Sequence, residues 1–181
     1  MPTLSEEPSL YPDTLLEEMA RLPSHRRWWV LHTKTRQEKA VARCLVAFQI
    51  PFYLPLVKKR TKYSGRQVEV TYIPLFASYV FVFGSDEERV RALSTNRVVQ
   101  TLWVEDQDRL CFELRQLRQL ILKNTPLTVE PRLTPGEYVR VRRGPFSGIE
   151  GVVLKRDGRN RLLVAVNFLR QGVSVDIEDC L

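Results

Sequence analysis

Short runs in which apolar and polar residues alternate fill most of the first two-thirds of the chain, and this period-2 pattern predicts strands. The longest apolar run, PLFASYVFVFG, is typical of a central strand covered on both faces. The two prolines of PFYLPLVKK favour an edge strand. Strands are therefore predicted at 28–33, 51–59, 67–73, 74–84 and 97–104.

A period near 3.6 residues predicts three helices among these strands. Thr35 and Glu38 have the spacing of a capping box at the start of the first helix, and Ser85 and Glu88 have it at the second. The third helix is predicted at 107–122. The order β-α-β-β-β-α-β-α predicts an α+β fold, with helices packed on a mainly antiparallel sheet.

The last third of the chain returns to short strands. Gly144-Pro145 ends the first of them, and both Gly148 and Gly151 are expected at turns because glycine adopts turn conformations at little cost. Phe146 is expected in the core. The predicted strands, at 137–143, 149–156, 161–168 and 172–177, indicate a small β-barrel.

Proline placement suggests how these parts are divided. Residues 1–26 contain four prolines and predict a flexible N-terminal extension with one short helix after Pro12. An α+β domain then spans 27–123, a proline-containing linker spans 124–134, and the barrel spans 135–181.

The formal net charge of +7 is unevenly distributed. Residues 34–66 hold nine Lys and Arg residues against a single Glu. A concentration this local favours nucleic acid as a ligand, and the alternative is an ordinary solvated face.

Catalytic and metal-binding patterns are missing from the sequence. His25 and His32 lie beside no cysteine or carboxylate cluster, and no phosphate-binding loop or nucleophile elbow occurs. Three cysteines without metal-ligand spacing predict no zinc site and no disulfide framework. We therefore expect no enzyme activity, no metal and no cofactor. The absence of a long apolar run and of a signal-peptide pattern predicts a cytoplasmic protein with no membrane contact.

Three segments together resemble the NusG family of bacterial transcription factors. WWVLHTKTRQEKAVARCL resembles the first strand and helix of its N-terminal (NGN) domain, IPLFASYVFV resembles its central strand, and GEYVRVRRGPFSGIEGVV resembles its SH3-like KOW barrel. The Pro-Leu-Phe entry is more similar to specialised antiterminators such as RfaH than to housekeeping NusG. Ala77-Ser78 departs from the Pro-Gly or Pro-Asn usual there, which leaves the geometry of this turn open.

The resemblance implies both partners and roles. The family's polymerase-binding patch, which contacts the clamp helices of RNA polymerase, corresponds to Tyr79 and Phe81, with Trp103 as a neighbour; the alternative is that all three belong to the core. In the barrel, Phe168 and Leu169 match the family's contact with ribosomal protein S10 or Rho. Non-template DNA in the transcription bubble would contact the basic residues Lys34, Arg36, Lys58, Lys59, Arg60, Lys62, Arg66 and Arg97.

The implied function is processive elongation or antitermination by a monomeric factor, on specific operons. Two alternatives stay open. One is a housekeeping NusG acting in Rho-dependent termination. The other is a ribosome-associated KOW protein that binds RNA.

Overall fold

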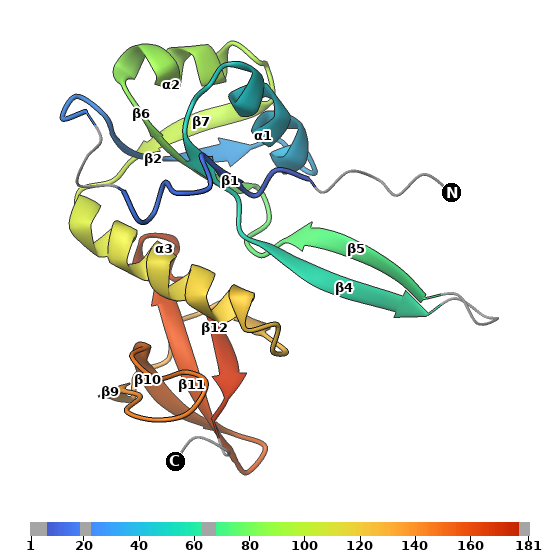
Figure 1. Cartoon of the computed structure of the whole chain (residues 1–181), viewed down its shortest axis with the longest axis vertical. Coiled ribbons are helices and arrows are strands. Elements are labelled where there is room, and N and C mark those ends of the chain that lie inside the picture. Colours follow the sequence, from blue (N-terminus) through green and yellow to red (C-terminus); the bar gives the residue numbers. More distant parts are fainter. Residues whose placement is uncertain (1–6, 19–22, 63–67, 178–181) are drawn as a thin grey trace. The chain divides into compact units, whose positions relative to one another are not determined.

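The computed structural model describes residues 7–18, 23–62 and 68–177 of the chain (Figure 1). The chain divides into two compact units, Met1–Glu105 and Asp106–Leu181, here called unit 1 and unit 2. Helices and antiparallel sheets occur together, which confirms the predicted α+β class. None of the helices in the described ranges is long and apolar enough to cross a membrane.

Unit 1 is built on a five-stranded antiparallel sheet whose strands follow the spatial order β1-β3-β6-β2-β7. The predicted central strand is confirmed: β6 lies third in this order, and all but its first residue are buried. The strands are β1 (Leu10–Tyr11), β3 (Phe52–Tyr53), β6 (Tyr79–Gly84), β2 (Arg27–Thr33) and β7 (Val98–Trp103).

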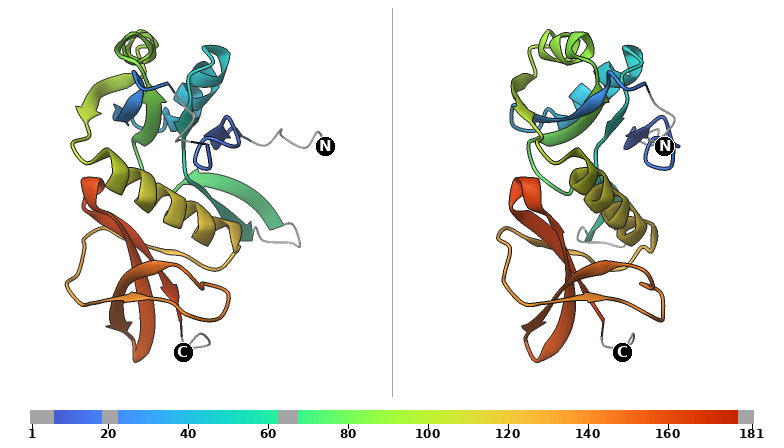
Figure 2. Two further views of the ribbon diagram at one scale, coloured as in Figure 1. Left: turned by 60° about the vertical axis from the view of Figure 1, so that its left-hand side comes forward. Right: turned by 90° about the vertical axis from the view of Figure 1, so that its left-hand side faces the viewer.

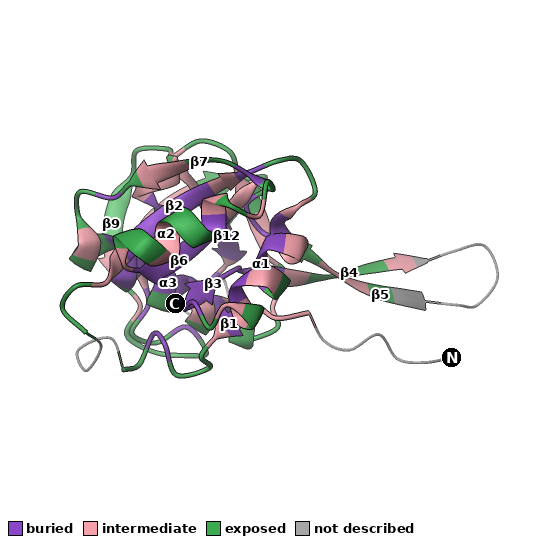
Figure 3. Ribbon diagram, turned by 90° about the horizontal axis from the view of Figure 1, so that it is seen from above, coloured by how far each residue is buried: buried purple, intermediate pink, exposed green. Residues whose placement is uncertain are grey.

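Helices α1 (Glu38–Ala47) and α2 (Asp86–Leu93) pack on one face of this sheet. Side chains of α1 and α2 share a fully buried core with Leu31, Val80 and Val82, which alternate along β2 and β6. Figure 3 shows the contrast between the buried β2 and β6 and the outward surface of α2.

The two predicted capping boxes have different outcomes. The box of Ser85 and Glu88 is confirmed, with both of its reciprocal hydrogen bonds present. The box of Thr35 and Glu38 is wrong, because α1 begins after Gln37 and no side chain caps it. Glu38 is buried and instead accepts a hydrogen bond from the backbone N–H of Ser78.

Residues 7–18 differ from the extension expected at the N-terminus. Leu10 and Tyr11 pair with β3 and add an edge strand to the sheet, and residues 12–18 form turns where a helix was expected. Leu15 and Leu16 are fully buried. Residues 10–16 are therefore part of the folded protein, since apolar side chains are stabilised out of water.

The strand expected at 51–59 splits at Leu54 and Pro55. Its first part, β3, lies inside the sheet rather than at an edge, because β1 covers its free side. Its second part, β4 (Leu56–Lys62), pairs only with β5 (Val68–Pro74). These two strands form a ribbon that extends away from the five-stranded sheet (Figure 1). The predicted Ser64-Gly65 turn lies outside the described residues.

Unit 2 combines helix α3 (Gln107–Leu122) with a second five-stranded antiparallel sheet (Figure 2). The curved sheet confirms the predicted barrel, and Phe146 is buried in it. The segment expected to be a linker contributes the edge strand β8, which pairs with β12. In spatial order the strands are β8 (Thr128–Glu130), β12 (Gln171–Asp176), β11 (Arg159–Val166), β10 (Glu150–Arg156) and β9 (Glu137–Arg140).

Two glycines of the barrel have different physical roles. Gly148 has a φ of +88°, the left-handed conformation expected of a turn glycine. Gly151 instead lies inside β10, opposite Val139. A Cβ atom on Gly151 would stand 2.3 Å from the carbonyl oxygen of Leu163, so this position requires glycine because of close backbone approach.

Candidate nucleic-acid and partner interfaces

The predicted polymerase-binding residues lie on both faces of the unit 1 sheet. Across the β2–β6 ladder, Tyr79 pairs with His32 and Phe81 pairs with Val30. Directly opposed residues point to the same face of a sheet, and Tyr79 and Phe81 share parity, so both lie on the face opposite α1 and α2.

Trp103 does not join this patch. Its strand, β7, is separated from β6 by β2. Trp103 pairs with Trp29, which alternates with Leu31 and therefore lies on the helix-covered face of the sheet, and so does Trp103. The indole of Trp103 is 55% exposed, meets the ring of Trp29 edge to face, and lies under the guanidinium of Arg27. The expectation of Trp103 as a neighbour of Tyr79 is therefore wrong.

The residues that flank Tyr79 across the sheet are His32 of β2 and, beyond it, Gln100 of β7. His32 lies between Tyr79 and Gln100 in the cross-strand register, and its imidazole stacks on the Tyr79 ring with centroids 5.3 Å apart. Tyr79 and His32 are partly exposed and Gln100 is exposed. Sequence reasoning missed His32 and Gln100, since only strand pairing reveals which residues of β2 and β7 flank Tyr79.

Phe81 is fully buried, and its ring packs edge to face against Phe76. In this structure the Phe81 side chain belongs to the core and offers no surface of its own. Its contact with polymerase stays a prediction.

The basic residues predicted to bind nucleic acid share one property. Among the described residues, no ion pair involves the exposed side chains of Lys34, Arg36, Lys58, Lys59, Arg60 and Arg97. Three other arginines of unit 1 form ion pairs: Arg26 with Glu88 at 2.6 Å, Arg43 with Glu7 and Arg89 with Asp86. The side chain of Lys62 and the whole of Arg66 lie outside what the structure describes.

Backbone geometry brings the first group of these cations together. The N–H of Lys34 donates to the carbonyl oxygen of Arg97 across 2.8 Å, and the Arg97 guanidinium donates to the side chain of Gln37. Arg36 follows in a left-handed conformation with a φ of 60°. Lys34, Arg36 and Arg97 thus lie in one region, where β2 ends and both α1 and β7 begin.

The second group of cations lies on β4 of the ribbon. Lys58 pairs with Tyr72, Lys59 with Thr71 and Arg60 with Val70. Alternation places Lys58 and Arg60 on one face and Lys59 on the other. All three are exposed, and Val70 is 48% exposed beside Arg60.

In unit 2, Phe168 and Leu169 lie in the 3-10 turn Asn167–Leu169 between β11 and β12. Sequence reasoning expected a strand, in which only one of them could face outward. The turn removes that alternation, and both side chains are partly exposed. Their partner contact stays a prediction.

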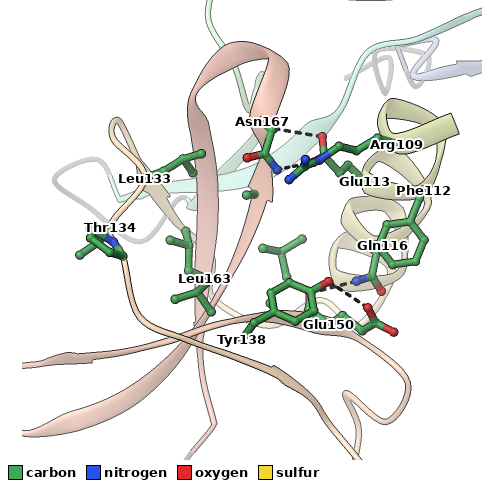
Figure 4. A pocket seen from close by; sticks show the side chains of 15 residues that line it. Arg109, Phe112, Glu113, Gln116, Leu133, Thr134, Tyr138, Glu150, Leu163 and Asn167 are labelled. Carbon is green, nitrogen blue, oxygen red and sulfur yellow. Dashed lines mark hydrogen bonds and ion pairs between the residues drawn. The ribbon is translucent and has the colours of Figure 1, made fainter. Parts of the chain in front are cut away.

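A cleft of about 440 Å³ separates α3 from the barrel strands of unit 2 (Figure 4). Glu113 of α3 is buried and accepts hydrogen bonds from both the backbone and the side chain of Asn167, while Arg109 donates to the same carboxylate. Gln116 donates to the carbonyl oxygen of Glu150 across 2.9 Å. The bonds from Asn167 to Glu113 tie the turn that carries Phe168 to α3, and the Gln116 bond ties β10 to the same helix.

Tyr138 closes another part of this cleft, where its hydroxyl donates to the Glu150 carboxylate across 2.9 Å (Figure 4). Burial raises the pKa of the Tyr138 phenol above its ordinary value of 10.0, and the hydrogen bond and charge of Glu150 raise it further. The phenol therefore stays neutral and serves as a donor at neutral pH. Over the described residues there is no group of three His, Cys, Asp or Glu side chains placed to hold a metal ion.

In unit 1 two helices cover one face of an antiparallel sheet, and unit 2 holds a small barrel with a glycine-dependent strand pair. Residues 26–119 match the family model described as transcription termination factor nusG, and residues 135–166 match the KOW motif. These two matches define the class of protein, a transcription elongation/termination factor. The chain belongs to the NusG family, whose members are non-catalytic transcription factors that generally bind RNA polymerase.

Among solved structures, one described as "Domain interaction in Thermotoga maritima NusG" is similar, with 20% sequence identity and a TM-score of 0.45. The match covers 84% of this chain and 94% of the other. No curated protein sequence gives a significant match.

Proposed function

We propose that this chain is a specialised NusG-family factor that keeps RNA polymerase elongating through pauses and terminators on particular operons. The observation that carries the proposal is a group of exposed cations in unit 1, Lys34, Arg36, Lys58, Lys59, Arg60 and Arg97, for which the described residues supply no carboxylate partner. The same unit bears the partly exposed Tyr79–His32 row. Cations without carboxylate partners keep their full potential for an anionic ligand. The bounds 27–123 and 135–181 for the polymerase-binding and barrel domains, with 124–134 between them, stay a proposal, because α3 groups with unit 2 and β8 pairs with barrel strand β12.

The row of Tyr79, His32 and Gln100 is the proposed contact with the clamp helices of the polymerase. Stacked aromatic rings with polar edges suit helix binding, since aromatic anchors carry much of the energy of such interfaces. Binding one clamp conformation in preference to others would shift the polymerase toward its elongating state.

The cations are the proposed contact with the non-template strand of the transcription bubble. Lysines neutralise phosphates, whereas Arg36, Arg60 and Arg97 can also stack on bases or bond to them in pairs. Any sequence preference would therefore rest on the arginines and on the base contacts they permit.

The barrel is the proposed recruiting module, with Phe168 and Leu169 contacting ribosomal protein S10 or Rho. Binding of S10 would couple transcription to translation, whereas binding of Rho would terminate transcription. A transcription assay with Rho separates these alternatives, because a housekeeping-type factor would increase Rho-dependent release, whereas the proposed factor would reduce it.

The direct test is run-off transcription by bacterial RNA polymerase through a pause and a terminator. We expect fewer paused products and more readthrough with the wild-type protein. Tyr79→Ala and His32→Ala should each remove the effect while leaving thermal unfolding nearly unchanged, since both side chains are partly exposed. Unchanged pausing together with no polymerase pull-down would overturn the proposal.

A further inference from the structure

We propose that a cavity at the base of the β4–β5 ribbon holds one unstacked base of a single nucleic-acid strand, and that it favours bases with an exocyclic amino group. This inference rests on the proposed nucleic-acid function and adds the position and chemistry of a base-binding site. The cavity, about 360 Å³ in volume, is lined by Arg36, Glu38, Lys39, Tyr72, Ile73, Pro74 and Ala77.

The lining combines the three features that a nucleotide requires. Tyr72 supplies an aromatic ring, and Ile73 and Pro74 supply apolar walls. Arg36 and Lys39 bring positive charge to the same cavity. Base–aromatic stacking beside cations is the common mode of single-strand binding, and the volume lies at the small end of the range for ligand pockets.

The ribbon supplies a path for the strand that leads to this cavity. Lys58 lies directly opposite Tyr72, and its ammonium nitrogen is 5.9 Å from the centroid of the Tyr72 ring. Arg60 follows on the same face. Phosphates that pass Lys58 and Arg60 would therefore bring the attached bases to the Tyr72 side of the ribbon, whereas Lys59 lies on the other side.

Glu38 supplies the base preference. One of its carboxylate oxygens, Oε1, accepts the N–H of Ser78 across 2.6 Å, and no other hydrogen bond to this side chain comes from the described residues. A carboxylate in the cavity wall can accept from the amino group of cytosine or adenine. Thymine presents no amino group, and its carbonyl oxygens would face a negative charge.

A duplex does not suit this site. Its bases are stacked and paired, and bringing one to Tyr72 would cost the free energy of unstacking and unpairing. In a single strand the bases are free to turn out and stack on side chains. The open non-template strand of a bubble meets this condition.

The test measures affinity of the full-length protein for labelled homopolymer oligonucleotides of deoxycytidine, deoxyadenosine and thymidine by fluorescence anisotropy, with a duplex for comparison. We expect tighter binding to the cytosine and adenine strands than to thymine or duplex. Tyr72→Ala should weaken binding about tenfold. Tyr72→Phe should bind about as tightly as the wild type, because it keeps the stacking ring. The same anisotropy measurement with RNA oligonucleotides shows whether DNA or RNA is bound more tightly.

Lys58 and Lys59 form a matched pair of equal charge on opposite faces. Lys58→Ala should lower the slope of log affinity against log salt by about 0.7, the value for one phosphate of a single strand, and Lys59→Ala should change it much less. Glu38→Gln should reduce the preference for cytosine and adenine over thymine.

The outcomes separate this inference from the proposed function. If the wild-type protein binds single strands but Tyr72→Ala is neutral, or Lys58→Ala equals Lys59→Ala, the base site is wrong and general nucleic-acid binding stands. If duplex is bound more tightly than every single strand, the base site is also wrong. If the wild-type protein binds no strand, both the base site and the proposed nucleic-acid contact are wrong, whereas polymerase binding is tested separately by the pull-down.

Discussion

The backbone N–H of Ser78 donates to Oε1 of Glu38 across 2.6 Å, joining the turn before β6 to the first residue of α1. Ser78 has a φ of 66°, a left-handed conformation that costs most side-chain-bearing residues about 1–2 kcal/mol. The carbonyl oxygen of Ser78 is also bonded, to the N–H of Thr33. The protein thus forms this left-handed turn with serine, and both backbone polar groups of Ser78 are hydrogen-bonded.

Ser78→Gly should therefore leave the free energy of unfolding unchanged or raise it by up to about 1 kcal/mol, because relief of the left-handed strain exceeds or offsets the extra entropy of glycine in the unfolded chain. Ser78→Val should lower it by about 1–3 kcal/mol. Urea denaturation measures both, and equal stability of the two variants would contradict a left-handed Ser78.

Trp103 and Tyr79 should behave differently toward polymerase because they lie on opposite faces of the sheet. Tyr79→Ala should abolish binding, whereas Trp103→Ala should retain most of it. Surface plasmon resonance with core polymerase measures the two affinities. A loss on Trp103→Ala as large as that on Tyr79→Ala would show that the partner reaches both faces.

Phe81→Ala should act on stability before it acts on binding, because Phe81 is fully buried. Truncating a buried phenylalanine costs about 3–5 kcal/mol, much of the stability of a small domain. Calorimetry should show a large fall in the melting temperature for this variant and little change for Tyr79→Ala. A stable Phe81→Ala variant that fails to bind polymerase would place Phe81 at the interface after all.

The two barrel glycines give a matched comparison. Gly151→Ala should destabilise unit 2 by about 1–3 kcal/mol, because its Cβ would meet the Leu163 carbonyl and force the strands apart. Gly148→Ala should cost about 1–2 kcal/mol, since its surroundings are open and only the left-handed φ opposes a side chain. Hydrogen exchange across β10 and β11 distinguishes them, because only Gly151→Ala should loosen that ladder.

Glu113→Ala should release the turn at Asn167 from α3. The variant loses a buried carboxylate that accepts from Asn167 and Arg109, and hydrogen bonds to charged groups contribute about 1.5–3 kcal/mol each. Hydrogen exchange should rise at the Asn167 amide and in α3. Arg109→Ala is the control, since it removes only the exposed partner and should leave the Asn167 amide protected.

Tyr138 predicts a pH dependence at the alkaline end. Its phenol has a raised pKa, so its contribution to stability is full below pH 10.0 and is lost as pH rises through the raised value. Glu150→Gln should bring the pKa of Tyr138 down toward its ordinary value by removing the carboxylate charge. Ultraviolet difference titration of this variant against Tyr138→Phe measures that change.

Much of the local structure could be predicted from residue patterns. The alternation in β2, β5 and β7, the apolar run of β6 and the capping box at Ser85 each depend on residues close together in the chain. The predicted box at Thr35 is absent, because α1 begins after Gln37 and the Glu38 carboxylate accepts from the amide of Ser78, forty residues away. Over residues 12–18 turns replace the helix expected after Pro12, while Leu10 pairs with β3 and Leu15 is buried.

Some features of the candidate sites follow from neighbouring residues in the chain, and others depend on the tertiary structure. The amino-acid sequence by itself determined the family, the order of elements and the local excess of cations, since motifs, periodicity and charge are properties of neighbouring residues. Only the tertiary structure decided that Trp103 faces away from Tyr79, that His32 flanks Tyr79, and that Tyr72 and Arg36 share a cavity. Those relations depend on strand register and packing between distant segments, where a shift of one residue reverses every side chain.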